Sequence, residues 1–161
     1  MGYINIVNID DFKQAVGKFP TGVCVIATNY QDQLFGFTAN SFVSVSLEPA
    51  LISFYLDKKS YSLQAFYQAD YFTVNILSND QTDISNHFAR SLKDKFQGIS
   101  YQLNEHDTPL LDGSISALEC EKYNHMDCGD HVLFVGQVQK VKVDNTKHPL
   151  VYYGKKYREL T

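Results

Sequence analysis

The stretch Gly-Phe-Thr-Ala-Asn-Ser-Phe-Val-Ser-Val-Ser-Leu-Glu-Pro, residues 36–49, decides the fold that we expect for this chain. Alternate residues of an extended chain lie on opposite faces, so the pattern predicts a strand that runs onward from Asn40. The two faces would carry Asn40, Phe42, Ser44 and Ser46 on one side and Ser41, Val43, Val45 and Leu47 on the other. One face is apolar and the other carries mostly short hydrogen-bonding side chains. The polar face is either exposed to water or part of a binding surface.

Apolar runs on both sides of this stretch predict further strands at residues 23–28, 34–39, 51–56, 71–77, 114–122 and 131–143. Apolar residues at helical spacing predict helices over 10–18, capped by Asp10, from residue 63 onward, and over 81–90, capped by Asp80. Residues 93–113 are expected to form an irregular surface excursion, and residues 123–130 to join the last two strands. Helices that do not alternate regularly with strands favour a mainly β fold, an antiparallel barrel with a few helices.

The length and composition favour one globular domain over residues 1–161. The chain has 161 residues, of which 44% are hydrophobic and 20% are charged, so it can bury a sizeable core. Its formal net charge is −4 and its longest basic run is Lys-Lys, which argues against a nucleic-acid partner.

The ends of the chain and its cysteines bear on location. The N-terminal residues 1–11 lack the pattern of a secretory leader, Ile6 stands where a myristoylation signal requires Ser or Thr, and no segment has membrane-spanning length. Cys24, Cys120 and Cys128 are an odd number and lie in or beside apolar runs, which suits free thiols in a reducing compartment. We therefore expect a cytoplasmic protein that has no membrane anchor.

A short polar loop at residues 57–62, Asp-Lys-Lys-Ser-Tyr-Ser, joins a predicted strand to a predicted helix. Helix N-termini present unpaired N–H groups, so Lys58, Ser60 and Ser62 could form a phosphate site. The alternative is a solvated loop in which a serine caps the helix.

Two groups of residues near the last predicted strands could have a chemical role. Cys120, His125, Cys128 and His131 are ligand types that zinc uses, although their spacing matches no familiar zinc motif; His125 could equally be an exposed turn residue and Cys120 a small core residue. The Gly129-Asp130-His131 sequence places an acid and an imidazole at the start of a strand, where they could bind a cofactor or carry protons. The common nucleotide-binding and hydrolase motifs, Gly-x-Gly-x-x-Gly, Walker A, Gly-x-Ser-x-Gly and His-Glu-x-x-His, are absent from the sequence.

Several segments together resemble the short-chain flavin reductases, the reductase components of two-component flavin-dependent monooxygenases. The matching segments are 19–23 (Phe-Pro-Thr-Gly-Val), 36–49, 72–77 (Phe-Thr-Val-Asn-Ile-Leu), 129–131 (Gly-Asp-His) and 152–157 (Tyr-Tyr-Gly-Lys-Lys-Tyr). They occur in the family's order along nearly the whole chain. The resemblance implies an FMN-binding split barrel, a homodimer, and hydride transfer from NADH or NADPH to FMN or FAD, with the reduced flavin passed to a partner monooxygenase.

The resemblance also implies a set of site residues. The flavin ring and ribityl chain would lie against Thr38, Ala39, Asn40 and Ser41, with Ser44 and Ser46 nearby, and Lys58 and Ser60 would bind its phosphate. His131 would lie beside the ring where nicotinamide stacks, and Tyr153 or Tyr157 would help to cover the site. The chain departs from the family's usual pattern at Ser60-Tyr61-Ser62 and at Cys128.

Two other functions remain open from the sequence. One is a flavin-binding electron carrier on the same fold, and the other is a non-enzymatic flavin- or zinc-binding interaction module.

Overall fold

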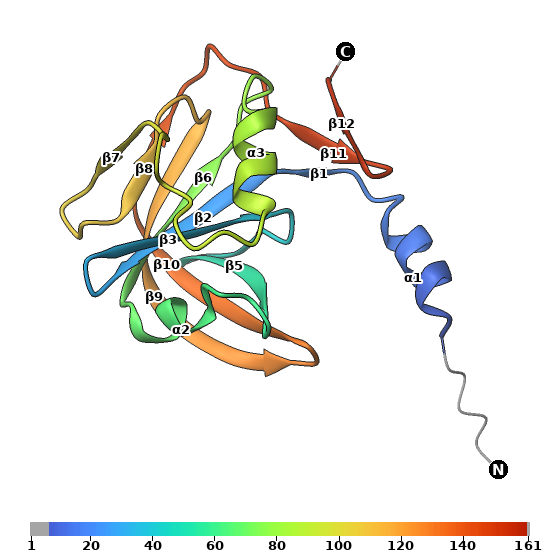
Figure 1. Cartoon of the computed structure of the whole chain (residues 1–161), viewed down its shortest axis with the longest axis horizontal. Helices are drawn as coiled ribbons and strands as arrows, with labels where there is room; N and C mark the ends of the chain where they lie inside the picture. Colours follow the sequence, from blue (N-terminus) through green and yellow to red (C-terminus); the bar gives the residue numbers. More distant parts are fainter. Residues whose placement is uncertain (1–6, 161) are drawn as a thin grey trace.

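The computed structural model describes residues 7–160, and the predictions made for residues 1–6 lie outside this range. Figure 1 shows a curved sheet with helices at its margins. The helices of the described range are α1 (Ile9–Val16), α2 (Leu63–Gln68) and α3 (Thr82–Ala89). Its strands are β1 (Thr21–Gly22), β2 (Cys24–Tyr30), β3 (Gln33–Ala39), β4 (Val43–Leu47), β5 (Ala50–Asp57), β6 (Tyr71–Ile76), β7 (Tyr101–Leu103), β8 (Pro109–Leu111), β9 (Ser116–Cys128), β10 (His131–Val143), β11 (Val151–Tyr153) and β12 (Lys156–Arg158).

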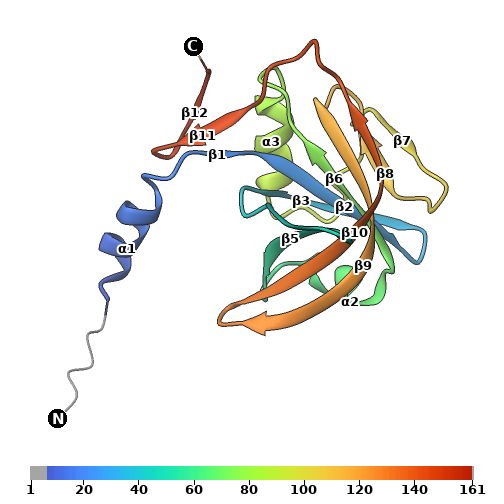
Figure 2. The same ribbon diagram turned by 180° about the vertical axis from the view of Figure 1, so that it is seen from behind.

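The strands of residues 7–160 pair antiparallel throughout, which confirms the predicted mainly β class. The largest sheet has seven strands in the order β3-β2-β6-β9-β10-β5-β4, so β3 and β4 are its edges. A second sheet has the order β1-β11-β12, and β7 and β8 form a separate hairpin. Figure 2 shows from behind how β9 and β10 extend as a long hairpin beyond the rest of the sheet, close to α2.

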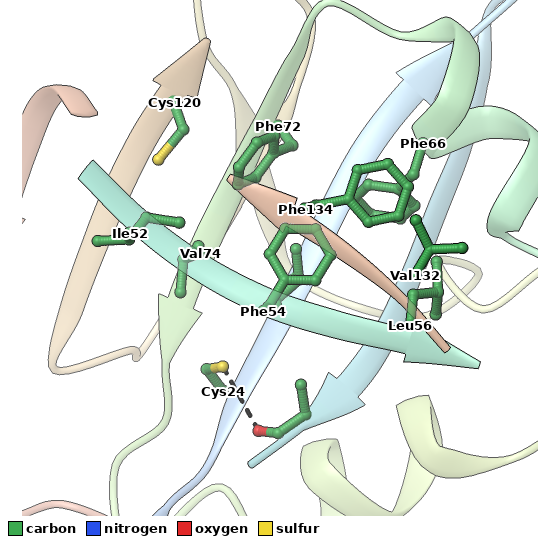
Figure 3. Packing of buried hydrophobic residues seen from close by; sticks show 12 residues of the cluster. Cys24, Ile52, Phe54, Leu56, Phe66, Phe72, Val74, Cys120, Val132 and Phe134 are labelled. Atoms are coloured by element: carbon green, nitrogen blue, oxygen red, sulfur yellow. Dashed lines mark hydrogen bonds between the residues drawn. The ribbon is translucent and has the colours of Figure 1, made fainter. Parts of the chain in front are cut away.

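Aromatic side chains fill the inside of the seven-stranded sheet (Figure 3). The ring of Phe54 on β5 is fully buried and stacks on Phe134 of β10, with ring centroids 5.3 Å apart. Phe72 of β6 meets Phe54 edge-on at 5.2 Å, and Phe66 of α2 does so at 5.7 Å. These contacts explain why β2, β5, β6 and β10, predicted from apolar runs, fold as strands around one core.

A second buried cluster lies on the other face of β2. It joins Val25 of β2 to Phe88 of α3, to Phe96 in the segment that follows α3, and to Leu150 before β11. The continuous apolar run of β2 therefore has a physical reason, because this strand is covered on both faces as predicted.

The strand that was expected to run onward from Asn40 begins only at Val43. β3 ends at Ala39, residues 40–42 form a bend, and β4 begins at Val43. A register shift between Ser44 and Ser46 interrupts the pairing of β4 with β5. The apolar side chains Val43, Val45 and Leu47 are exposed, and Leu47 is 94% exposed. The predicted start at Asn40 was therefore wrong, because the chain turns at 40–42 to pass from one edge of the sheet to the other.

Four smaller predictions also need correction. Asn8, not Asp10, caps α1, since its side chain accepts the N–H groups of Asp10 and Asp11. Asp80 bonds to the Ser78 hydroxyl and does not cap α3, whose N-cap is Gln81. β9 continues to Cys128, so only Gly129 and Asp130 separate it from β10. Residues 93–113 are not wholly irregular, because β7 and β8 pair within them.

Candidate functional site

A cavity of about 490 Å³ opens between four parts of the chain. Its walls are the end of β3 and the bend after it, the loop after β5, the segment after α3, and the first residue of β10. The lining residues are Phe37, Thr38, Ala39, Asn40, Ser41, Tyr55, Leu56, Asp57, Lys59, Ser60, Tyr61, Ser62, Phe88, Ala89, Arg90, Ser91, Leu92, Lys95 and His131. Six of the residues predicted for the site thus meet in one place: Thr38, Ala39, Asn40, Ser41, Ser60 and His131.

The β3 wall is held in position by hydrogen bonds of its own polar side chains. The Thr38 hydroxyl donates to the backbone carbonyl of Ser85 in α3 at 2.6 Å. The Ser41 hydroxyl oxygen accepts the N–H of Tyr55 in β5 at 3.1 Å. Thr38 and Ser41 therefore shape the wall, and the small side chain of Ala39 leaves space beside it.

The loop wall carries a basic residue, but it is not the predicted one. Lys59 lines the cavity, whereas Lys58 forms an ion pair with Asp127 of β9 at 3.2 Å. The Ser60 hydroxyl accepts the N–H of Ser62 at 3.3 Å, and Ser62 makes no side-chain cap bond to α2. Because α2 has six residues, its dipole adds little, and the positive charge on this wall comes from Lys59.

His131 enters the cavity from the tip of the β9–β10 hairpin. It pairs with Cys128 on one side and with Asp57 at the end of β5 on the other. Its Nδ1 lies 2.6 Å from the Asp130 carboxylate. This hydrogen bond, and then the charge of the imidazole, lowers the pKa of Asp130. An ionised Asp130 accepts the Nδ1 proton, which fixes the ring and leaves Nε2 free to act.

The fourth wall, after α3, was missed from the sequence. Ala89, Arg90, Ser91, Leu92 and Lys95 line it. The Lys95 ammonium donates to the Phe88 carbonyl at 2.8 Å, and burial lowers its pKa. The basic residues Arg90 and Lys95 were the available signal, but Arg90 was predicted as the end of a helix and Lys95 as part of the surface excursion at residues 93–113.

Besides Lys58, four predicted residues do not line this cavity. Ser44 and Ser46 lie on the edge strand β4. Tyr153 lies beside α1, at a separate pocket. The Tyr157 hydroxyl is bonded to the Ser85 hydroxyl at 2.8 Å and to Asn86 at 3.0 Å.

The possible zinc ligands are not brought together. Cys120 is paired with Val138 and Cys128 with His131, so the two cysteines lie far apart along β9. The His125 ring packs against Tyr67 with centroids 5.1 Å apart. Within residues 7–160, no group of three or more His, Cys, Asp or Glu side chains could hold a metal ion. No helix of this range is long and apolar enough to cross a membrane.

The residues present suit a flat ring with a phosphate tail. Small side chains at Ala39, Ser41 and Ser60 leave room, and Lys59 and Arg90 can attract an anion. β3 is an edge strand, and edge strands have backbone N–H and C=O groups that are free to bond a ligand. The cavity volume of about 490 Å³ lies in the range of small-molecule sites.

The whole chain was also compared with known proteins. The family model described as "Flavin reductase like domain" matches residues 16–161. The reductase component of the flavin-dependent trigonelline monooxygenase of Acinetobacter baylyi is 40% identical over 141 residues, which are 86% of this chain and 46% of that relative. The chain thus spans about half the length of that protein. A flavin reductase from Pseudomonas putida is 33% identical over 88% of this chain and 84% of its own length.

A solved structure is similar along nearly its whole length. The NADH:FAD oxidoreductase of Streptomyces globisporus C-1027, in complex with NAD and FAD fragments, superimposes with a TM-score of 0.91 at 30% identity. The match covers 98% of this chain and 97% of that one.

Proposed function

Because this chain belongs to the flavin reductase like domain family, we propose that it is an NAD(P)H:flavin oxidoreductase that reduces FMN or FAD. The proposal takes residues 1–161 as a single domain of this kind. The observation that carries it is the meeting of Thr38, Ala39, Asn40, Ser41, Ser60 and His131 around one cavity. These residues come from three separate segments of the sequence, and all six were expected at a flavin site.

We place the flavin ring against the bend after β3 and its phosphate near Lys59 and Ser60. When both nucleotides are bound, a hydride passes from nicotinamide C4 to flavin N5. The protein's task is to hold two rings in contact, so rigid walls matter more than a strong acid or base. The hydrogen bonds of Thr38 and Ser41 supply that rigidity.

His131 is proposed to contact the nicotinamide side of the site. Asp130 orients its ring through Nδ1, so Nε2 can donate or accept a hydrogen bond in the cavity.

Steady-state assays test this function. Purified protein should oxidise NADH or NADPH when FMN, FAD or riboflavin is added, and inactivity with every pair would disprove the reductase function.

His131→Ala should raise the KM for NAD(P)H or lower kcat about tenfold, with little change in flavin affinity. His125→Ala is the matched control, since His125 lies on the same hairpin but does not line the cavity. If His131→Ala changes neither kcat nor the KM for NAD(P)H at saturating flavin, His131 has no role in the mechanism.

The proposed partners are a second copy of the chain and a flavin-dependent monooxygenase. α1 has no buried residue in the single chain and exposes Ile9, Phe12 and Val16, and β4 exposes Val43, Val45 and Leu47. Such apolar surface supports a homodimer. A monooxygenase partner is supported by the Acinetobacter relative, which is the reductase component of a flavin-dependent monooxygenase. A cytoplasmic location stays a prediction, supported by the buried free thiols of Cys24 and Cys120.

A further inference from the structure

Lys122, on β9 and outside the cavity, binds the C-terminal end of α2. Its ammonium donates to the backbone carbonyls of Phe66 at 3.3 Å, Tyr67 at 2.6 Å and Ala69 at 2.7 Å. An ammonium has three donors, so this arrangement uses all of them. Burial lowers the pKa of Lys122, but three carbonyl acceptors require its protonated form.

The helix cannot satisfy this end by itself. The last carbonyls of any helix lack partners within the helix, and a basic side chain in the last turn is one way to bind them. The sequence of α2, Leu-Gln-Ala-Phe-Tyr-Gln, has no basic residue. Lys122 supplies the missing cation from a strand that is distant in sequence.

α2 follows directly on the loop wall of the cavity. Lys59, Ser60, Tyr61 and Ser62 all line the cavity, and α2 begins at the next residue. The N–H of Leu63 donates to the Ser60 carbonyl at 3.1 Å, and that of Phe66 to the Ser62 carbonyl at 3.2 Å. A displacement of the helix would therefore move this wall.

The same hairpin holds the other end of the loop. The Lys58 N–H donates to the Asp130 carbonyl at 3.0 Å, and its ammonium pairs with Asp127. Figures 1 and 2 both show α2 beside β9. Residues 57–69 are thus attached to the β9–β10 hairpin at both ends. The hydrogen bonds of Lys122 are less exposed, whereas the ion pair between Lys58 and Asp127 is largely exposed to solvent.

We propose that Lys122 is a positioning residue for flavin binding: by binding the end of α2, it sets the place of residues 59–62 on the cavity wall. The role rests on the proposed function, since it concerns the same site. Lys122 touches neither flavin nor nicotinamide, so its loss should weaken flavin binding and leave hydride transfer intact once flavin is bound.

Lys122→Met tests the role, because methionine keeps an unbranched apolar chain and removes the ammonium. We expect the flavin Kd, measured by quenching of flavin fluorescence without NAD(P)H, to rise about tenfold. The loss of hydrogen bonds to a charged group can weaken binding by this amount. The KM for flavin should rise likewise, while kcat at saturating flavin and the KM for NAD(P)H should stay within about twofold. Lys122→Arg should restore most of the affinity, since guanidinium also has several donors.

A control variant separates this role from a general loss of stability. Asn104→Ala removes a side chain that accepts three hydrogen bonds in the turn between β7 and β8, away from the cavity. It should lower Tm without changing the flavin Kd. If Lys122→Met lowers Tm and leaves the flavin Kd unchanged, or lowers kcat instead, the proposed role is wrong.

Two further outcomes are distinguishable. If Lys122→Met does not fold, Lys122→Gln, which can still donate to some of the carbonyls, should raise the flavin Kd about threefold, and an unchanged Kd would overturn the proposal. A wild-type protein that binds flavin but oxidises neither NADH nor NADPH would contradict the reductase function. The flavin Kd of the Lys122 variants would still test the positioning role of Lys122.

Discussion

Two apolar regions of this molecule differ sharply in what surrounds them. The ring of Phe54 is completely buried among Phe66, Phe72 and Phe134. The apolar side chains of α1 and β4 lie on the surface, and Leu47 is 94% exposed. The chain therefore buries one apolar region by itself, and the proposal is that a second copy of the chain covers the other.

Truncation of a phenylalanine side chain should lower the free energy of unfolding far more in the core than on α1. Phe54→Ala should lower the free energy of unfolding by about 3–5 kcal/mol, because it removes a ring from the centre of an aromatic cluster. Phe12→Ala is the matched control on α1, where the ring is 54% exposed, and should cost less than about 1 kcal/mol at protein concentrations that keep the chain monomeric. Urea unfolding monitored by circular dichroism gives both values. If both variants lose the same free energy of unfolding, the two regions do not differ in burial.

Adding one carbon to the core should also destabilise the fold. A Cβ at Gly136 would lie 2.3 Å from Cζ of Phe72, a ring that the core already confines. Gly136→Ala should therefore lower the free energy of unfolding by about 1–3 kcal/mol. At Gly22 a Cβ meets nothing within 4 Å, so Gly22→Ala should be nearly neutral in the same unfolding measurement. A Gly136→Ala protein as stable as wild type would show that Phe72 can move aside.

Most of the core and part of the site could be predicted from the sequence, for identifiable reasons. The continuous apolar run of β2 predicts a strand covered on both faces, and the structure places a cluster on each side of it. In the loop after β5 there is no such periodicity, so Lys58 and Lys59 could not be told apart. The choice between them depends on Asp127, which lies on a distant hairpin and attracts Lys58.

The segment after α3 and the bend at 40–42 illustrate the same limit. Arg90 and Lys95 reach the cavity because Phe88 and Phe96 are buried on either side of them. Alternation was applied through residues 40–42, where the chain instead turns between the two edge strands. Long-range packing decided both cases, and the local sequence alone did not show that Arg90 and Lys95 face the cavity or that the chain turns at residues 40–42.

A charge on β4 should weaken the proposed homodimer without unfolding the chain. Leu47→Asp should raise the dimer dissociation constant at least about tenfold, because the charge must lose water in an apolar interface. Its effect on monomer stability should stay within about 0.5 kcal/mol, as for other exposed positions. Leu103→Asp is the matched control, since Leu103 is a half-exposed leucine on β7. Sedimentation equilibrium measures both proteins, and a Leu47→Asp dimer as tight as wild type would place β4 outside the interface.

In the wild-type protein, the buried thiols and the accessible thiol should differ in reactivity. Burial raises the pKa of both the Cys24 and the Cys120 thiol to about 12 from an ordinary value of 9.0, whereas Cys128 is partly exposed. The native protein at pH 8 should therefore react with a disulfide reagent at Cys128 alone, and the other two thiols should react only after unfolding in urea. Since the unfolded chain loses these two protons more readily than the folded chain, stability should be unaffected by them below pH 9 and should fall as the pH rises towards 12. Three thiols that react at one fast rate would contradict the burial of Cys24 and Cys120, and with it the closed core on which the comparison with β4 depends.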